Sequence, residues 1–343
     1  MARRTRKAPL TRALQRTLNV ITRQVTRTVS QAMTRALQAP PSVVAPSAAQ
    51  RVPVRNADCR LGLVVGLAGA RRYWLYKPPG LRRTERLPLV VMLHGCGQNA
   101  EALAASSQMN RIAERQRFLV LYPEQGRLAN AAGCWNWYET RSGRAQGEAG
   151  TIEAAIDQVC LLQPVDPERI ALAGLSAGAG MAALLATRRP ERFRAIAMHS
   201  GIAPGVAHSS ATALMAMGGR QARALPLAPL AAGVRLPGLL VIHGSSDPVV
   251  APSNGAEAAR SWAARIGAKA GTPRTVQRGA RYAATVTDYR CGRRLVASLC
   301  EVKGLGHAWS GGAAGQAYSD PKGPDASRMI WAFMVKQFAR GGD

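Results

Sequence analysis

The sequence predicts an α/β fold in which a mostly parallel sheet is flanked by helices. Three observations support this prediction. From about residue 58 onward, apolar runs of strand length alternate with helical segments, the order typical of parallel sheets. The run at residues 87–93 is almost continuously apolar, as expected for a strand covered on both faces. A Gly-x-Ser-x-Gly stretch at residues 174–178 stands between a short apolar run and a helix of small residues.

The length of 343 residues allows one large α/β domain or two small ones, and a hydrophobic content of 47% allows a substantial core. The net charge of +27 favours an anionic partner surface such as nucleic acid, phospholipid or a granule coat. The alternative explanation is free use of Arg by a GC-rich genome together with one basic arm. Zinc-finger and RNA-binding signatures are absent, so specific nucleic-acid recognition is not expected. The sequence contains no run of 18 apolar residues, so no transmembrane helix is expected.

Residues 1–38 contain no acidic residue and carry an apolar stripe opposite most of their arginines. This pattern predicts a basic amphipathic helical arm that contacts an anionic lipid or granule coat. An organelle-type targeting peptide and a helix docked on its own domain are the alternatives. Residues 39–57 are rich in Pro, Ala, Ser and Val and predict a linker, which leaves residues 58–343 as the folded domain.

Along the folded domain, strands are predicted at residues 72–77, 87–93, 118–122, 170–173, 195–199 and 239–243. Helices are predicted at residues 102–117, 148–162 and 179–187, after residue 243 through about residue 268, and at residues 325–339. Residues 283–289 and 295–303 predict a hairpin or the last strands of the sheet. Residues 126–147 predict a long irregular loop.

Ser176 is the predicted nucleophile. A strand before it and a helix after it give Gly-x-Ser-x-Gly the context of a nucleophile elbow, a sharp turn that lifts the hydroxyl above the sheet edge. Gly174 and Gly178 allow this turn and close packing of the helix on the strand. The amide of Ala177, at the positive end of the helix, is a predicted oxyanion donor.

A nucleophilic serine needs a general base and an acid that orients it. His307 lies in a Gly-rich loop after the last predicted strand, where a mobile imidazole reaches the elbow, and is the predicted base. Asp247 follows the strand at residues 239–243 and is the predicted acid, because the carboxyl ends of parallel strands share one edge of a sheet. Asp288 and Glu301 are weaker rivals because they fall inside strand patterns.

The second oxyanion donor is predicted to be the amide of Cys96, in the Gly-rich turn after residues 87–93. His94, in the same turn, is expected to be a structural histidine held by hydrogen bonds rather than a base. Trp135, Trp137 and Trp309 stand in loops beside the predicted site and suggest a substrate-binding wall for an apolar acyl group, although core filling is the better reading for any single tryptophan.

Six cysteines hint at disulfides and hence an oxidising compartment, whereas the N-terminus has no ordinary Sec signal. A Cys96–Cys134 bridge would pin the aromatic loop to the oxyanion turn if the compartment is oxidising. The cysteine spacing fits no metal site, and no nucleotide motif is present, so no metal or cofactor is expected. A cytoplasmic or granule-associated location is favoured, with secretion as the alternative.

Together, several motifs resemble the polyhydroxybutyrate (PHB) depolymerase family of α/β-hydrolase esterases. The resemblance covers about residues 70–338 and is carried by residues 73–76, 93–96, 118–125, 134–137, 174–178, 199–201, 307–312 and 320–327. It implies a Ser176–His307–Asp247 triad with the amides of Cys96 and Ala177 as the oxyanion hole. One departure is Ala177-Gly178-Ala179-Gly180-Met181, where the family more often has two adjacent glycines before Ala-Met.

The resulting hypothesis is a serine esterase that hydrolyses poly(3-hydroxybutyrate) or its oligomers, and short-chain esters, through an acyl-enzyme. The expected partner is a polyester polymer or the surface of its granule. One alternative is an esterase for feruloyl or acetylxylan carbohydrate esters or for other small short-chain esters. The other is a granule-surface binding protein that uses a hydrolase fold without need of catalysis.

Overall fold

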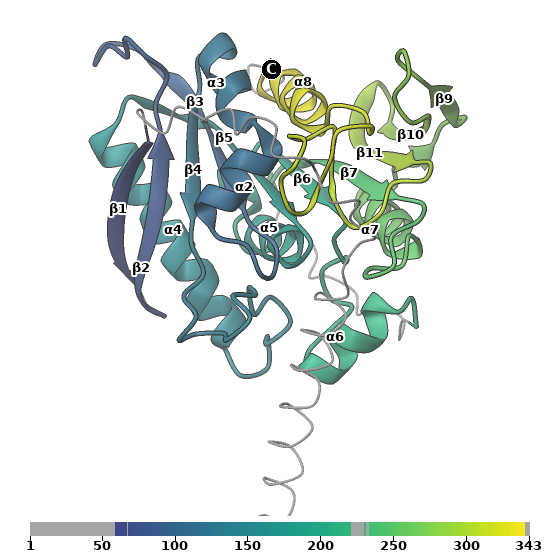
Figure 1. Cartoon of the computed structure of the whole chain (residues 1–343), viewed down its shortest axis with the longest axis horizontal. Helices are drawn as coiled ribbons and strands as arrows, with labels where there is room; N and C mark the ends of the chain where they lie inside the picture. Colours follow the sequence, from purple (N-terminus) through teal and green to yellow (C-terminus); the bar gives the residue numbers. More distant parts are fainter. Residues whose placement is uncertain (1–58, 67, 221–229, 231–232, 340–343) are drawn as a thin grey trace, which may run out of the picture. The chain divides into compact units, whose positions relative to one another are not determined.

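A parallel sheet with antiparallel edges forms the centre of the protein (Figure 1). The computed structural model describes residues 59–66, 68–220, 230 and 233–339. The predicted arm at residues 1–38 and the linker at residues 39–57 lie outside these described residues.

The main sheet has the strand order β1-β2-β4-β3-β5-β6-β7-β11-β10-β8, and β9 pairs with β10. Its neighbours from β4 to β11 in this order are parallel, and the pairs on either side are antiparallel. The strands span β1 (Cys59–Gly66), β2 (Gly69–Tyr76), β3 (Leu87–Leu93), β4 (Leu119–Pro123), β5 (Val165–Leu175), β6 (Ala195–His199), β7 (Gly238–Gly244), β8 (Lys269–Ala270), β9 (Arg274–Val276), β10 (Ala284–Cys291) and β11 (Arg294–Val302). A separate parallel pair consists of β12 (Trp309–Ser310) and β13 (Ser319–Asp320).

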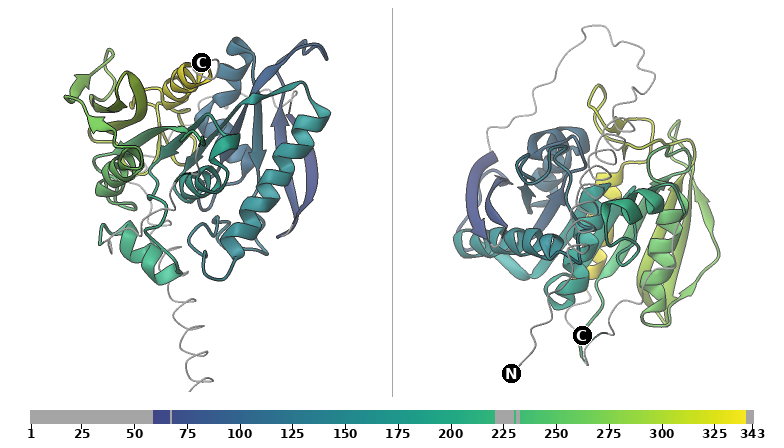
Figure 2. Two further views of the ribbon diagram at one scale, coloured as in Figure 1. Left: turned by 180° about the vertical axis from the view of Figure 1, so that it is seen from behind. Right: turned by 90° about the horizontal axis from the view of Figure 1, so that it is seen from below.

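Helices cover both faces of the sheet, as the views from behind and from below also show (Figure 2). The α-helices are α2 (Ala100–Ser107), α3 (Met109–Gln116), α4 (Arg144–Leu162), α5 (Ala177–Arg188), α6 (Ser210–Met217), α7 (Ser253–Ala264) and α8 (Ala326–Phe338). A short 3₁₀ helix, η2, spans Pro190–Arg192. With the helices packed against it, the central sheet forms the α/β-hydrolase fold expected from the sequence.

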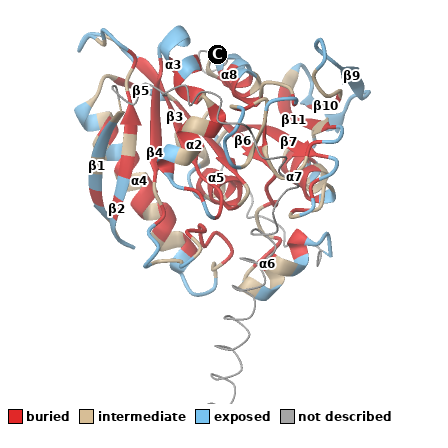
Figure 3. Ribbon diagram, in the orientation of Figure 1, coloured by how far each residue is buried: buried red, intermediate tan, exposed pale blue. Residues whose placement is uncertain are grey.

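The central strands are fully covered (Figure 3). Every residue of β3, β4, β6 and β7 is buried, which explains their continuous apolar sequences. The carboxyl ends of β3, β5, β6 and β7 meet at one edge, because parallel strands point the same way. The turns that follow these strands therefore gather there, and they contain Cys96, Ser176, Ser200 and Asp247.

Most predicted elements are present, with three differences. The predicted helix at residues 102–117 is two helices, α2 and α3, because Gln108 takes a left-handed conformation with φ of 54° and its amide caps α2 at Ala104. The loop predicted to end at residue 147 ends where α4 begins, at Arg144. The helix predicted through residue 268 ends at Ala264, and Gly267 follows in a turn with φ of 65°.

The elements that were not predicted are β1, α6, the short strands β8 and β9, the helix η2 and the β12–β13 pair. Residues 283–289 and 295–303 were expected as a hairpin or as the last strands, and they satisfy both descriptions. Strand β10 pairs antiparallel with β11, and β11 pairs parallel with β7.

Candidate active site

Ser176 occupies a sharp turn between β5 and α5. Its φ of 55° and ψ of −119° are unusual for a residue with a side chain, and the conformation is held by its amide, which donates to the carbonyl of His199 at 2.8 Å. The side chain is half-exposed at the sheet edge. The predicted strand–turn–helix context is therefore present.

The two glycines of the motif are required by packing. A Cβ on Gly174 would lie 2.3 Å from the backbone carbonyl group of Gly178, and a Cβ on Gly178 would lie 2.1 Å from the carbonyl oxygen of Leu93. Neither position accepts a side chain without moving backbone. Close contact between α5 and the end of β3 thus depends on these glycines.

The turn at residues 94–98 lies directly beside Ser176. A Cβ on Gly95 would be 3.5 Å from the Cβ of Ser176. The neighbouring amides are engaged, since Gly95 donates to Gln98 Oε1, Gly97 to the carbonyl of Ala132 and Gln98 to the carbonyl of Gly95. Within the described part of the chain, the amide of Cys96 has no hydrogen-bond acceptor.

The other predicted oxyanion donor is the amide of Ala177. Ala177 is the first residue of α5, where an amide has no acceptor within its helix. No acceptor for it is found among the other described residues either. Two unoccupied amides, those of Cys96 and Ala177, therefore belong to the two turns that meet at Ser176. An amide at a helix N-terminus also carries the positive end of the helix dipole, which favours a negative oxygen.

Asp247 and His307, which are 60 positions apart in the chain, are in contact. His307 Nδ1 donates to Asp247 Oδ2 at 2.8 Å, while Asp247 Oδ1 accepts from the amides of Val249 and Val250, each at 2.9 Å. With the proton on Nδ1, the Nε2 atom of His307 is free to accept one. The His307 side chain is only 6% exposed, and the Asp247 side chain is fully buried.

Asp247 remains ionised despite its burial. Burial by itself raises the pKa of this carboxyl, but hydrogen bonds from His243 and His307 and from the amide of Val250 outweigh it, and the pKa is held well below its usual range. His243 Nε2 lies 3.5 Å from Asp247 Oδ2 and donates to the carbonyl of Val250 at 2.9 Å. A carboxylate that stays charged can orient a neighbouring imidazole and stabilise its protonated form.

The sequence reasoning missed the role of His199, which ties the two halves of the site together. Its carbonyl accepts the amide of Ser176, and its ring Nε2 accepts the amide of Ser310 at 3.0 Å, three residues beyond His307. Nδ1 then carries the proton and donates to the hydroxyl of Ser200 at 3.2 Å. Its position at a strand end, next to Ser200-Gly201, was the available signal.

The surroundings of His199 keep the imidazole neutral. Its ring stacks on Trp309, with centroids 5.2 Å apart and planes inclined by 22°. Burial, followed by the neighbouring His243 and His307, lowers the pKa of His199 to about 3. A neutral ring can accept the amide of Ser310, whereas a protonated ring could not.

His94 has the structural role expected from the sequence. Its Nδ1 donates to the carbonyl of Gly95 at 2.9 Å, and its Nε2 accepts the amide of Gln125 at 3.0 Å. The ring is completely buried, and burial is the main reason that the pKa of His94 is lowered to about 4. It therefore supports the turn that carries the Cys96 amide.

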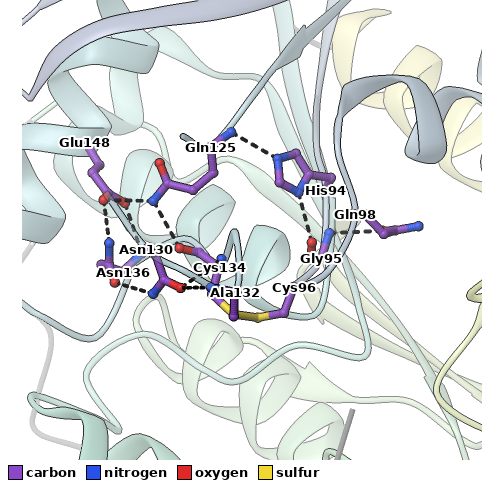
Figure 4. Close-up of a disulfide and its surroundings, with 10 residues drawn as sticks. All are labelled: His94, Gly95, Cys96, Gln98, Gln125, Asn130, Ala132, Cys134, Asn136 and Glu148. Atoms are coloured by element: carbon purple, nitrogen blue, oxygen red, sulfur yellow. Dashed lines mark hydrogen bonds between the residues drawn. A yellow bond between two sulfur atoms is a disulfide. The ribbon is translucent and has the colours of Figure 1, made fainter. Parts of the chain in front are cut away.

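A disulfide joins Cys96 to Cys134, as Figure 4 shows, and so links the oxyanion turn to the loop before α4. A polar network fixes this loop. The buried carboxylate of Glu148 accepts from the Asn136 amide at 2.9 Å and from Gln125 Nε2 at 2.8 Å. Asn130 Oδ1 accepts the amides of Ala132 and Cys134 at 3.0 and 3.3 Å.

The three tryptophans predicted to form a substrate-binding wall are buried in the structure. Trp135 and Trp309 have no exposed surface, and Trp137 is 6% exposed. Trp135 packs against His94, with ring centroids 5.5 Å apart, and Trp309 donates from Nε1 to Ser327 Oγ at 3.1 Å. The rings of Trp135 and Trp309 therefore fill the core beneath the loops and offer no surface to a substrate.

The two rival acids lie on the outer strands of the sheet. Asp288, on β10, forms an ion pair with Arg274 at 3.0 Å and accepts from Ser298 Oγ at 2.7 Å. Glu301 lies on β11, opposite Thr285 of β10. Of the three carboxylates, Asp247 is the one that forms a hydrogen bond with His307 in the described part of the chain.

The described ranges of the chain contain no group of three or more His, Cys, Asp or Glu side chains placed to hold a metal ion. None of their helices combines the length and apolar character needed to cross a bilayer.

Comparison with known proteins identifies the family. The model of the family described as "Esterase PHB depolymerase" matches residues 71–278, which is more than half of the chain. The chain belongs to this family. Among solved structures, it is similar to the acetyl xylan esterase from Aspergillus awamori, with a TM-score of 0.58 and 20% identity over 72% of this chain and 94% of that one. At this level of identity, the likeness concerns the fold.

Curated relatives include both polyester and carbohydrate esterases. Poly(3-hydroxyalkanoate) depolymerase C from Paucimonas lemoignei is 36% identical over 49% of this chain and 42% of its own length. A probable acetylxylan esterase A from Neosartorya fischeri is 25% identical over 60% of this chain and 58% of its own. Feruloyl esterase B from Neurospora crassa is 27% identical over 69% of this chain and 82% of its own length. The matches thus span about half the length of the first two relatives.

Proposed function

We propose that this member of the Esterase PHB depolymerase family hydrolyses carboxylic esters with Ser176 as nucleophile, His307 as general base and Asp247 as the residue that orients His307. One observation carries the proposal: the loop of the Asp247–His307 pair is joined through His199 to the strained Ser176 elbow, and the turns at that elbow hold two unoccupied amides. This set of groups is the one required for acyl transfer to a serine.

The reaction proceeds in two halves. Ser176 Oγ attacks the ester carbonyl while His307 Nε2 takes its proton, and the amides of Cys96 and Ala177 donate to the developing oxyanion. His307 then passes the proton to the leaving alcohol, which leaves an acyl group on Ser176. In the second half, His307 activates a water that releases the acid and restores the serine.

We propose poly(3-hydroxybutyrate) or its oligomers as the substrate. The family match and the similarity to a poly(3-hydroxyalkanoate) depolymerase support this choice. A carbohydrate ester is the second candidate, since acetylxylan and feruloyl esterases are also similar to this chain over more than half of its length. A granule-surface binding protein without need of catalysis is the third, and the complete set of site residues argues against it.

The deciding experiment measures hydroxybutyrate release from amorphous poly(3-hydroxybutyrate) granules by the full chain and by Ser176→Ala. Release by the wild type alone supports both the nucleophile and the substrate class. Hydrolysis of p-nitrophenyl butyrate with no release from polymer moves the substrate to small or carbohydrate esters, which release of acetate or ferulate would identify. Inactivity on every ester favours the binding protein.

We also propose that residues 1–38 adsorb the protein to a negatively coated apolar particle, on the basis of their sequence alone. A chain that lacks residues 1–40 is then expected to lose its pelleting with polyester granules while it keeps its activity on soluble esters. Unchanged pelleting would refute this role of the arm.

A further inference from the structure

Tyr318 is held in a backbone conformation that few residues with side chains adopt. Its φ is 54°, and the other non-glycine residues with positive φ in the described ranges are Gln108, Arg117, Ser176 and Ser200. Ser176 and Ser200 belong to the site. Because such strain persists only where the surrounding structure imposes it and is concentrated at functional sites, the conformation of Tyr318 suggests a function for this residue.

The surrounding hydrogen bonds attach Tyr318 to the loop of His307. The carbonyl of Tyr318 accepts the amide of Trp309 at 2.8 Å, and Trp309 follows His307 by two residues. Beyond it, β13 pairs with β12, and the amide of Gly311 donates to the carbonyl of Asp320 at 2.7 Å. The position of Tyr318 is therefore fixed relative to the loop that carries His307.

The side chain of Tyr318 also lies beside the oxyanion turn at residues 94–98. A Cβ on Gly97 would lie 3.2 Å from the Tyr318 hydroxyl oxygen, and Gly97 directly follows Cys96. Gly97 is exposed and Tyr318 is half-buried, so the hydroxyl lies where the oxyanion turn meets solvent. Among the described residues, no partner is found for this hydroxyl.

The ring and the hydroxyl of Tyr318 have separate surroundings. The ring packs against the hydrophobic core, while the hydroxyl lies outside it at Gly97. Burial raises the pKa of Tyr318, so the phenol is protonated at neutral pH and is able to donate a hydrogen bond. A rigidly placed donor next to the oxyanion turn is suited to bind an oxygen atom of the acyl group.

We propose that the Tyr318 hydroxyl donates a hydrogen bond to the oxygen on carbon 3 of a 3-hydroxyacyl substrate, and so distinguishes such acyl groups from unsubstituted ones. This inference rests on the proposed esterase function. If the Cys96 amide holds the ester carbonyl oxygen, as proposed above, the hydroxyl beside the next residue, Gly97, would face the carbons that follow that carbonyl. A 3-hydroxyacyl unit has an oxygen there, as a hydroxyl or as an ester oxygen within a polymer, whereas acetyl and butyryl groups have none.

The test compares the full-length wild type with Tyr318→Phe on p-nitrophenyl 3-hydroxybutyrate and on p-nitrophenyl butyrate. The two substrates differ only in the oxygen on carbon 3. We expect Tyr318→Phe to lower kcat/KM on the hydroxylated ester by about 3- to 10-fold, the effect of one neutral hydrogen bond, and to leave kcat/KM on the butyrate unchanged. Tyr289→Phe, on the outer strand β10, is the matched control and should change neither.

Each outcome separates the inference from the function on which it rests. A wild type inactive on both esters refutes the proposed function. A wild type active on both, with Tyr318→Phe reduced equally on the two esters or on neither, refutes the role of Tyr318 alone. Since phenylalanine keeps the ring and the thermal melting temperature reports the fold, an equal loss accompanied by a lowered Tm would also count against the hydrogen bond.

Discussion

Replacement of Gly178 by alanine tests how the nucleophile elbow and the oxyanion turn are held together. The new Cβ would lie 2.1 Å from the carbonyl oxygen of Leu93 and 2.6 Å from that of His94. Non-bonded carbon and oxygen atoms need well over 3 Å, so α5 and the end of β3 must separate by about 1 Å or more. Both contacts are with backbone, which cannot rotate away as a side chain can.

The expected result is a loss of both activity and stability. The Cys96 amide follows His94 by two residues, so the separation moves this donor away from Ser176. A misplacement of about 1 Å in a catalytic constellation costs about 100-fold in rate, and overpacking of a core costs about 1–3 kcal/mol. Steady-state kinetics on p-nitrophenyl butyrate should therefore show kcat reduced about 100-fold, and denaturant unfolding should show the lost stability.

Gly147→Ala provides the matched control. This glycine lies within α4, and its Cβ would be 3.7 Å from the Cβ of Ala68, an ordinary contact. We expect unchanged kcat and a gain of about 0.5–1 kcal/mol from the removal of a glycine inside a helix. If Gly178→Ala kept the kcat and stability of the wild type, the close packing of the elbow against the turn would be wrong as an explanation of the motif.

Three further predictions concern the acid, the disulfide and the buried histidines. Asp247→Asn should lower kcat by about 10⁴-fold without loss of the fold, because an amide neither fixes the tautomer of His307 nor stabilises its charge. Cys134→Ser should lower kcat about 10- to 100-fold with a smaller change in KM, because it frees the turn that carries the Cys96 amide. The free energy of unfolding should fall as the pH drops from about 6.5 to about 4, by up to about 1.4 kcal/mol per pH unit for each of His94 and His199. The pKa of these two imidazoles is lowered to about 4 and about 3, so over this range the unfolded chain binds protons that the folded chain does not.

Matched variants check each of these predictions. Asp288→Asn, on the outer strand β10, should leave kcat unchanged, and a fully active Asp247→Asn would exclude Asp247 as the orienting acid. Cys160→Ser, at a free cysteine of α4, should not affect kcat. For the histidines, denaturant unfolding at several pH values should give a shallower slope for His94→Gln than for the wild type; an equal slope would show that His94 does not titrate as described.

The sequence predicted the elbow and the parallel core because these features depend on local pattern. Gly174 and Gly178 flank Ser176 at two positions where a Cβ would meet backbone, and buried strand β3 is apolar throughout. The prediction that Asp247 and His307 belong together also rested on position, since each follows a strand that ends at the same edge. Their contact at 2.8 Å agrees with that reasoning.

Other features that depend on long-range contacts were not predicted. His199 was placed correctly at a strand end, but its bond to the amide of Ser310 joins residues 111 positions apart, and no local pattern specifies such a pairing. The burial of the tryptophans was likewise not predicted from local sequence. Trp135 and Trp309 were expected in exposed loops, yet both rings are completely buried, and Trp309 begins strand β12.

The loop before α4 shows how a segment without regular structure can position an amide accurately. Arg71 and Glu148 are both buried, and each binds Gln125, Arg71 through the side-chain oxygen and Glu148 through the nitrogen. Removal of either charged group alone would leave the other uncompensated in the core, which is more costly than loss of the pair. The network therefore resists partial disruption, and through Cys134 it transmits that rigidity to the Cys96 amide. Two structural restraints thus act on the turn at residues 94–98: the close contact of Gly178 of α5 with the end of β3, and the disulfide to this buried network.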